Sequence, residues 1–227
     1  MLRAVVLDVD FTLVKPGPDL GPDGYRRLGK RFGLHLDPAL YDDARTGAIE
    51  SLEQHPELDH DEEIWVMFTE RIIQGMGGLG PTREAAIEMT DAWRHAAHFE
   101  LYGDVLPALA DLRSRGLLLG LLSNTTRDLD AFVEHHRLEV DAVLTSGSHG
   151  KLKPHAAIFE RMLELLDVRA HEALMVGDTL EDDVEGARAV GMEALLLDRE
   201  GRYPHIDGRL TDLRQVVAAL GLPPTSA

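Results

Sequence analysis

The sequence predicts a doubly wound α/β core, built on a parallel sheet, with a helical insertion after its first strand. From Tyr102 onward, short apolar runs alternate with segments of helical spacing, which is typical of parallel strands covered by helices on both faces. Before this region, an apolar run at about residues 3–9 precedes a long stretch with helical spacing and almost no strand signal. These two patterns together predict an α/β core whose sequence is interrupted once, after the first strand, by a helical insertion.

The insertion is predicted to hold three helices. An amphipathic segment begins at Pro22 and ends at Gly33, which are residues typical of a helix start and a helix end. In "DEEIWVMFTERIIQ", residues 61–74, apolar side chains recur at spacings of four, and a third helical segment covers residues 82–98. This part of the chain has almost no strand signal.

The remainder of the chain predicts the core, with strands and helices in turn. Helices are expected around residues 105–115, 155–167 and 210–220, and one between each of the other successive strands. The predicted strands cover about residues 3–9, 117–123, 142–146, 173–176 and 193–198. We therefore expect a catalytic core made of residues 1–16 and 99–227, and a helical domain made of residues 17–98.

Composition excludes several classes of protein. A chain of 227 residues, 44% of them apolar, can fill a large core, and the lack of cysteine excludes disulfides, thiolate metal sites and cysteine nucleophiles. A formal net charge of −17 disfavours a nucleic-acid partner. The sequence has neither a leader-like start nor a run of about 18 apolar residues that could span a membrane. We expect a cytoplasmic protein that binds neither nucleic acids nor membranes.

Polar side chains follow several predicted strands at the edge where parallel strands end together. Asp8, Asp10 and Thr12 follow the first strand, and Ser123 with Asn124 follows the second. Ligands of such sheets bind at this edge. Only four of the 23 basic residues are lysines, so a lysine at this edge is informative. The other polar residues expected there are Lys151, Lys153, Asp178, Asp182 and Asp183.

The spacing of the first two aspartates indicates a metal site. Asp8 and Asp10 are two residues apart on a strand, so their side chains share a face, and two ionised carboxylates at such range repel each other. Adding Asp178 increases that repulsion. A hard divalent cation would relieve it, and Mg²⁺ suits a site made only of oxygen ligands. A bound metal, a hydroxyl and a lysine would in turn hold a phosphoryl group.

Four motifs resemble those of the haloacid dehalogenase superfamily of aspartate-nucleophile phosphotransferases. They are "DVDFTL", "LLSNT", "KLKP" and "GDTLEDDVEGARAVGM", and their order and gaps match the family from residue 8 to residue 192. The resemblance implies a Rossmann-like core. The helical insertion is similar to the family's cap and implies a small phosphorylated metabolite as the substrate.

The resemblance also implies a role for each motif residue. Asp8 would be the nucleophile that becomes an aspartyl phosphate, and Asp10 would be the general acid and base. Asp178 would bind the metal, and Asp183 would be its partner, although Asp182 fits the shorter spacing of other members. The implied catalytic residues are Asp8, Asp10 and Lys153; the implied phosphate-binding residues are Thr12, Ser123, Asn124 and Lys153; the implied metal ligands are Asp8, Asp10, Asp178 and Asp183.

Asp10 favours phosphoryl transfer over cleavage of a carbon–halogen bond, since family members that cleave such bonds lack an aspartate there. Phe11 departs from the family pattern, in which glycine is common at this position. Three alternatives stay open: a phosphomutase, a 2-haloacid dehalogenase, and a non-catalytic binding protein that retains the fold. The sequence names no single substrate and indicates no oligomeric state.

Overall fold

The computed structural model describes residues 1–52 and 57–221 and divides the chain into two compact units. The first unit contains Met1–Lys15, Leu101–Thr125 and the residues from Leu129 onward, and the second contains Pro16–Glu100 together with Thr126–Asp128. The chain leaves the first unit through β2 (Val14–Pro16) and returns through β3 (Phe99–Leu101). These two short strands pair as a sheet of their own, which the sequence does not predict.

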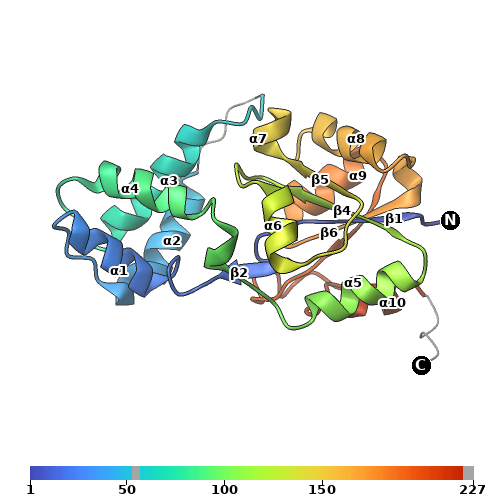
Figure 1. Ribbon diagram of the computed structural model, residues 1–227, viewed down its shortest axis with the longest axis horizontal. Helices are drawn as coiled ribbons and strands as arrows, with labels where there is room; N and C mark the ends of the chain where they lie inside the picture. The colour runs from blue at the N-terminus through green and yellow to red at the C-terminus, as the bar shows by residue number, and fades with distance from the viewer. Residues whose placement is uncertain (53–56, 222–227) are drawn as a thin grey trace. The chain divides into compact units, whose positions relative to one another are not determined.

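The first unit is built on a five-stranded parallel sheet with the order β5-β4-β1-β6-β7 (Figure 1). The chain moves outward from β1 to β4 and β5, and then crosses back to the other side of β1 for β6 and β7. The strand order therefore reverses at β1, and the carboxyl end of a strand at such a reversal is the usual ligand site of a doubly wound sheet. The strands are β1 (Ala4–Leu7), β4 (Leu118–Ser123), β5 (Ala142–Thr145), β6 (Ala173–Gly177) and β7 (Glu193–Leu196).

Both faces of the sheet are buried, so most successive residues of each strand are apolar and the strands form continuous apolar runs in the sequence. On one face, Val6 and Met175 are buried in a cluster with Phe159 and Met162 of α8 (Ala156–Leu165). In the register, Val6 lies opposite Met175, so one row of the sheet contributes to that cluster. Buried residues of α5 and α10 cover the other face (Figure 1). Coverage of both faces matches the predicted fold class.

Short helices connect the strands of the first unit. α7 begins with a capping box formed by Thr145 and Ser148. Between β6 and α9 the chain forms a π-helical turn, Leu180–Glu185. The helices are α5 (Val105–Ser114), α6 (Leu129–His136), α7 (Ser146–His149), α8 (Ala156–Leu165), α9 (Gly186–Ala189) and α10 (Gln215–Ala219).

The second unit contains four α-helices within the described residues. Its core buries Tyr25, Ile72, Ile73, Met76 and Met89. The helices are α1 (Pro22–Arg31), α2 (Tyr41–Glu50), α3 (Glu62–Gly75) and α4 (Thr82–Ala92). None of the described helices is both long and apolar enough to cross a lipid bilayer.

The helix predictions for the second unit are partly wrong. The sequence predicts no helix where α2 forms, because α2 has few apolar side chains and a glycine in its last turn. The third predicted helix is too long, since α4 ends at Ala92 and the backbone is extended again at His95. Trp93, just beyond α4, packs edge-on against Phe99 at 5.5 Å between ring centroids. In the first unit, α10 is likewise shorter than the predicted segment at residues 210–220.

Candidate active site

The sheet register brings three strand ends together. Leu7, the last residue of β1, lies opposite Leu121 of β4 and Val176 of β6. Asp8 follows directly and donates its backbone N–H to the carbonyl of Val176 at 2.9 Å. The register, continued by one residue, places Asp8 beside Leu122, which precedes the buried Ser123 at the end of β4, and beside Gly177 at the end of β6. The topology thus builds the site at the edge that the sequence predicts.

Lys153 lies at the centre of the site. Its Nζ lies 2.7 Å from Oδ1 of Asp8, 2.6 Å from Oδ1 of Asp183 and 3.0 Å from the carbonyl oxygen of Leu122. The Lys153 side chain is 2% exposed, and both aspartates are buried as well. Lys153, rather than Lys151, is the lysine that reaches the first aspartate. A buried ammonium with three acceptors is held in one position.

Asn124 fixes the main chain of Lys153. Its Oδ1 accepts the Lys153 backbone N–H at 2.7 Å, and its Nδ2 donates to the Lys153 carbonyl at 3.1 Å. Both ends of the amide therefore bind the main chain of a residue 29 positions away. Asn124 follows β4 directly, so these hydrogen bonds fix the main chain at Lys153 to the end of a central strand.

The structure separates the two candidate aspartates after β6. Asp183 is fully buried, and its Oδ2 accepts the N–H and the hydroxyl of Thr179 at 3.0 and 2.8 Å. A Cβ at Gly177 would lie 2.2 Å from Asp183 Cγ, so only glycine allows this close approach. Asp182 contacts Asn124 at 3.5 Å instead. Asp183, not Asp182, therefore turns toward Lys153.

Three of the predicted metal ligands converge. Within the described part of the chain, Asp8, Asp178 and Asp183 form the group of potential metal-binding side chains, with ligand atoms within 4.8 Å of one another. All three are buried and offer carboxylate oxygens. This donor set fits a hard divalent cation such as Mg²⁺. The carboxylate of Asp10 lies outside this group.

The electrostatics of the site support the same fit. Burial raises the pKa of the Asp8 carboxyl well above its usual range, against the opposing charge of Lys153. Burial, with a contribution from Asp183, raises the pKa of Asp178 to about 7. Burial alone would lower the pKa of Lys153, but the charges of Asp183 and Asp8 outweigh it and raise that pKa. One ammonium thus faces more carboxylates than it can neutralise, and a divalent cation would balance them.

The loop after β1 places the remaining residues of the first motif. Asp10 forms an isolated bridge with Val14, and the Phe11 N–H donates to the Val14 carbonyl at 2.7 Å. Phe11 has a φ of 62°, in the left-handed region that a residue with a bulky side chain rarely adopts. Thr12 is fully buried, and its Oγ1 has no hydrogen-bond partner among the described residues. The common glycine is thus replaced by phenylalanine at a position that suits glycine.

Two residues near Asp178 and Asp183 are absent from the sequence prediction. Thr179 binds Asp183, and their spacing of one helical turn is a signal that could have indicated the contact. Arg202 donates to the Asp178 carbonyl at 2.9 Å and forms an ion pair with the Asp178 carboxylate. Arg202 follows β7 in a segment without periodicity, so no local pattern indicates it.

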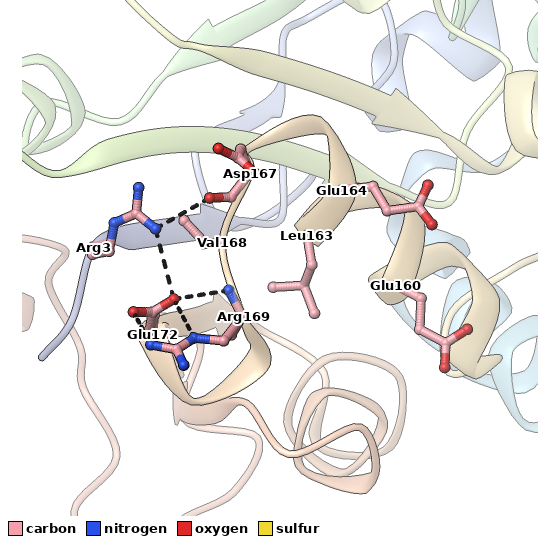
Figure 2. Close-up of a pocket in the computed structure, with 8 residues that line it drawn as sticks. All are labelled: Arg3, Glu160, Leu163, Glu164, Asp167, Val168, Arg169 and Glu172. Atoms are coloured by element: carbon pink, nitrogen blue, oxygen red, sulfur yellow. Dashed lines mark hydrogen bonds and ion pairs between the residues drawn. The ribbon is translucent and has the colours of Figure 1, made fainter.

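A hollow lies away from these strand ends, beside α8. Its volume is about 770 Å³, and none of the predicted site residues lines it. Figure 2 shows the side chains of Arg3 and Arg169 converging on Glu172, at 3.6 and 2.9 Å. Its arginines are already paired, so the hollow does not offer a free anion site. The lining residues are Arg3, Glu160, Leu163, Glu164, Asp167, Val168, Arg169 and Glu172.

Comparison with known proteins identifies the family. A model of the haloacid dehalogenase-like hydrolases matches residues 2–191. A phosphoserine phosphatase of Thermus thermophilus is 36% identical over 167 residues, which cover 68% of this chain and 66% of that protein. A ribulose-1,5-bisphosphate 5-phosphatase of Halopiger xanaduensis is 39% identical over 206 residues, which cover 87% of this chain and 85% of that protein.

Solved structures agree with this assignment. The crystal structure of a phosphatase of the same family from Thermococcus onnurineus superimposes with a TM-score of 0.65 at 27% identity, and the match covers 97% of this chain and 98% of that one. A hydrolase of Bacillus subtilis, solved bound to magnesium, has a TM-score of 0.73 at 15% identity over 97% and 99% of the two chains, which shows a shared fold. The chain therefore belongs to the haloacid dehalogenase-like hydrolases.

Proposed function

We propose that this protein is a Mg²⁺-dependent phosphatase that hydrolyses a small phosphorylated metabolite through an aspartyl phosphate on Asp8. One observation carries the proposal: the buried Lys153 ammonium lies between Asp8 and Asp183, and Asp178 completes a group of three carboxylates. The proposed nucleophile, the ammonium proposed to neutralise phosphate, and the carboxylates proposed to bind metal therefore lie close together. The names of the relatives, which include phosphatases of phosphoserine and of ribulose bisphosphate, support a small phosphate ester as the substrate.

Two covalent steps follow from these residues. First, a carboxylate oxygen of Asp8 attacks phosphorus, the bond from phosphorus to the leaving oxygen breaks, and Asp10 donates a proton to that oxygen. Next, Asp10 takes a proton from water as the water oxygen attacks the phosphorus of the aspartyl phosphate, and the bond from phosphorus to the Asp8 oxygen breaks. Inorganic phosphate leaves, and Asp8 and Asp10 return to their starting states. The net reaction is the hydrolysis of one phosphate ester.

The other site residues bind and orient. Lys153 neutralises the nucleophile and the phosphoryl oxygens, and the Ser123 hydroxyl binds one of those oxygens. Asn124 acts by holding the main chain of Lys153. Asp8, Asp178 and Asp183, with the backbone carbonyl of Asp10, would hold Mg²⁺, which when bound supplies further charge stabilisation to the phosphoryl group. Thr12 supports the loop that carries Asp10.

The helical unit is proposed to act as a cap that excludes bulk water during transfer, as in similar family members. Such a cap favours small substrates over phosphoproteins. A cysteine-free sequence accords with the cytoplasm, the compartment that we propose. The two-residue spacing of Asp8 and Asp10 favours the phosphatase over the dehalogenase on the same scaffold.

Phosphate release from a panel of esters tests this function. The panel holds phosphoserine, ribulose bisphosphate, glyceraldehyde 3-phosphate and an aryl phosphate, each with Mg²⁺ and with excess chelator. We expect metal-dependent release, abolished in Asp8→Asn and retained in Asp207→Asn, a matched change at an exposed aspartate. Halide release from a 2-haloacid in the presence of chelator would favour the dehalogenase. Interconversion of phosphate isomers with a bisphosphate activator, without net release, would favour the mutase.

A further inference from the structure

Arg199 lies outside all four motifs, yet it contacts the loop of the first motif. Its Nε and Nη2 both donate to the backbone carbonyl of Thr12, at 3.1 and 2.9 Å. Thr12 is two residues from Asp10, the proposed acid and base. A single carbonyl that accepts two charge-assisted hydrogen bonds is held firmly.

The guanidinium is itself fixed by Asp104. Its Nη1 lies 3.0 Å from Asp104 Oδ2, and the two side chains are 10% and 5% exposed. The same Asp104 oxygen accepts the backbone N–H of Leu213 at 2.6 Å. Because the ion pair is buried and its carboxylate is anchored to the main chain, the guanidinium has little freedom to move.

Arg199 also lies at the base of both connections to the helical unit. Its Cζ lies 4.0 Å from the ring centroid of Tyr102, the residue after β3. Tyr102 in turn donates its N–H to the carbonyl of Leu13, which precedes β2, at 3.0 Å. One guanidinium therefore joins the Thr12 carbonyl to the Tyr102 ring.

The loop that Arg199 holds is strained. Phe11 keeps a left-handed φ of 62°, a conformation that is unfavourable in a residue other than glycine and persists only where surrounding contacts enforce it. Within the loop, hydrogen bonds from Phe11 to Val14 and from Leu13 to Val9 stabilise the turn. The contact to the Thr12 carbonyl comes from outside the loop and opposes its relaxation.

We propose that Arg199, braced by Asp104, is a positioning residue that holds the Asp10–Thr12 loop in the conformation in which Asp10 can protonate the leaving oxygen. This inference rests on the proposed phosphatase function and deepens it. Arg199 touches no reacting atom in this account. Its effect on the reaction is transmitted through the main chain of Thr12.

Arg199→Lys keeps the positive charge but cannot present the same three N–H groups to Thr12 and Asp104. Its comparison variant is Arg113→Lys, at an ion pair whose side chains are more exposed, at 35% and 30%. Arg113 pairs with Asp141 at 3.0 Å, and Asp141 likewise accepts a backbone N–H, that of Leu119 at 2.8 Å. Neither Arg113 nor Asp141 has a contact with the motif-one loop among the interactions described. Asp104→Asn, with Asp141→Asn as its control, is a second pair in case Arg199→Lys folds poorly.

The first readout is the dependence on the leaving group. The value of kcat/KM reports the transfer to Asp8, in which an alkyl oxygen needs a proton and a nitrophenolate does not. We expect Arg199→Lys to lower kcat/KM for an alkyl phosphate by about 10- to 100-fold and for nitrophenyl phosphate clearly less. A residue that only stabilised the fold would lower both values by the same factor.

The second readout needs no activity. Hydrogen exchange of the peptide that spans residues 9–16 should be about tenfold faster in Arg199→Lys, since the hydrogen bonds of the loop open more often without the paired guanidinium hydrogen bonds to the Thr12 carbonyl. Arg113→Lys should leave that peptide unchanged.

A changed substrate ratio together with faster exchange in Arg199→Lys and in Asp104→Asn, and in neither control, would support the proposal. An unchanged ratio, or equal effects in variants and controls, would overturn it while the phosphatase function stands. A wild-type protein that releases no phosphate from any ester would instead overturn the proposed function, and with it the catalytic role given to Arg199.

Discussion

The ammonium of Lys153 lies 2.7 Å from a carboxylate oxygen of Asp8, and both side chains are buried. This distance joins the third motif to the first across 145 residues of sequence. In the proposed reaction the same ammonium neutralises first the nucleophile and then the phosphoryl group. The Lys153–Asp8 ion pair should therefore contribute both to the stability of the fold and to the proposed phosphoryl transfer.

Lys153→Met should impair both activity and folding. We expect kcat to fall by about 100-fold or more, because a preorganised charge is lost where negative charge develops. The free energy of unfolding should fall by about 3–5 kcal/mol in the presence of chelator, because Asp8 and Asp183 are left without their buried partner. Kinetics and urea unfolding measure the two effects. Lys30→Met, at an exposed lysine, is the control, and equal losses in both variants would contradict the assignment.

Asp178 should make the stability of the metal-free protein depend on pH. Its pKa is about 7 in the folded protein, above the usual value near 4, so the folded state binds more protons than the unfolded state between these values. This group therefore stabilises the fold below pH 4, and that contribution is lost as the pH rises through about 7. Thermal unfolding in chelator should show a smaller decline in Tm over this range for Asp178→Asn than for the wild type.

Mg²⁺ should oppose the decline in Tm that we expect in chelator as the pH rises. The cation binds the deprotonated carboxylates, so its stabilisation should increase as the pH rises from about 6 to about 8. The difference in Tm between samples with Mg²⁺ and with chelator, followed against pH, checks this expectation. A constant difference across the range would contradict it.

Arg202→Gln should strengthen the binding of a divalent cation. Arg202 is paired with the Asp178 carboxylate, and removing its charge removes both a competitor for that oxygen and a repulsive neighbour of the cation. We expect the Kd for Mg²⁺ to fall by about 3- to 10-fold in calorimetry. Arg209→Gln is the matched control, since Arg209 pairs with Asp198, which lies outside the carboxylate group. Weaker binding in Arg202→Gln would mean that the arginine orients Asp178 for the metal.

Asn124→Ala should affect the reaction through Lys153. The variant leaves the Lys153 N–H without its acceptor, which should cost about 1–3 kcal/mol in the free energy of unfolding. A displaced ammonium should lower kcat by about tenfold or more. Gln74→Ala, at an exposed amide, is the comparison and should change neither quantity. Full activity in Asn124→Ala would show that other contacts suffice to place Lys153.

The fold was predictable because its strands are apolar on both faces. Val6 packs on α8 while its neighbours in β1 are buried on the opposite face, so the strand forms an unbroken apolar run that sequence reveals. In a parallel sheet the carboxyl ends of the strands lie at one edge, so the strand predictions alone locate the candidate site. By contrast, the burial in α2 is sparse, with Tyr41 and Ala48 as its buried apolar residues, and a helix of that kind leaves little periodic signal.

The residues of the candidate site that belong to sequence motifs could be predicted. Those whose positions depend on tertiary packing could not. Spacing alone left Asp182 and Asp183 as alternatives. The π-helical turn after β6 and the lack of a Cβ at Gly177 turn Asp183 toward Lys153. Arg199 and Arg202 reach the site from an aperiodic segment, and their partners are distant in sequence. Contacts of that kind depend on tertiary structure and leave no local pattern.

The central claim is that Asp8 carries the phosphoryl group. Its most direct test is to mix the protein with substrate and Mg²⁺, quench in acid, reduce the acyl phosphate with borohydride, and identify the reduced residue by mass spectrometry. We expect homoserine at position 8, dependent on both substrate and Mg²⁺. Full phosphate release with an unreduced Asp8, or with the reduction at another aspartate, would contradict it.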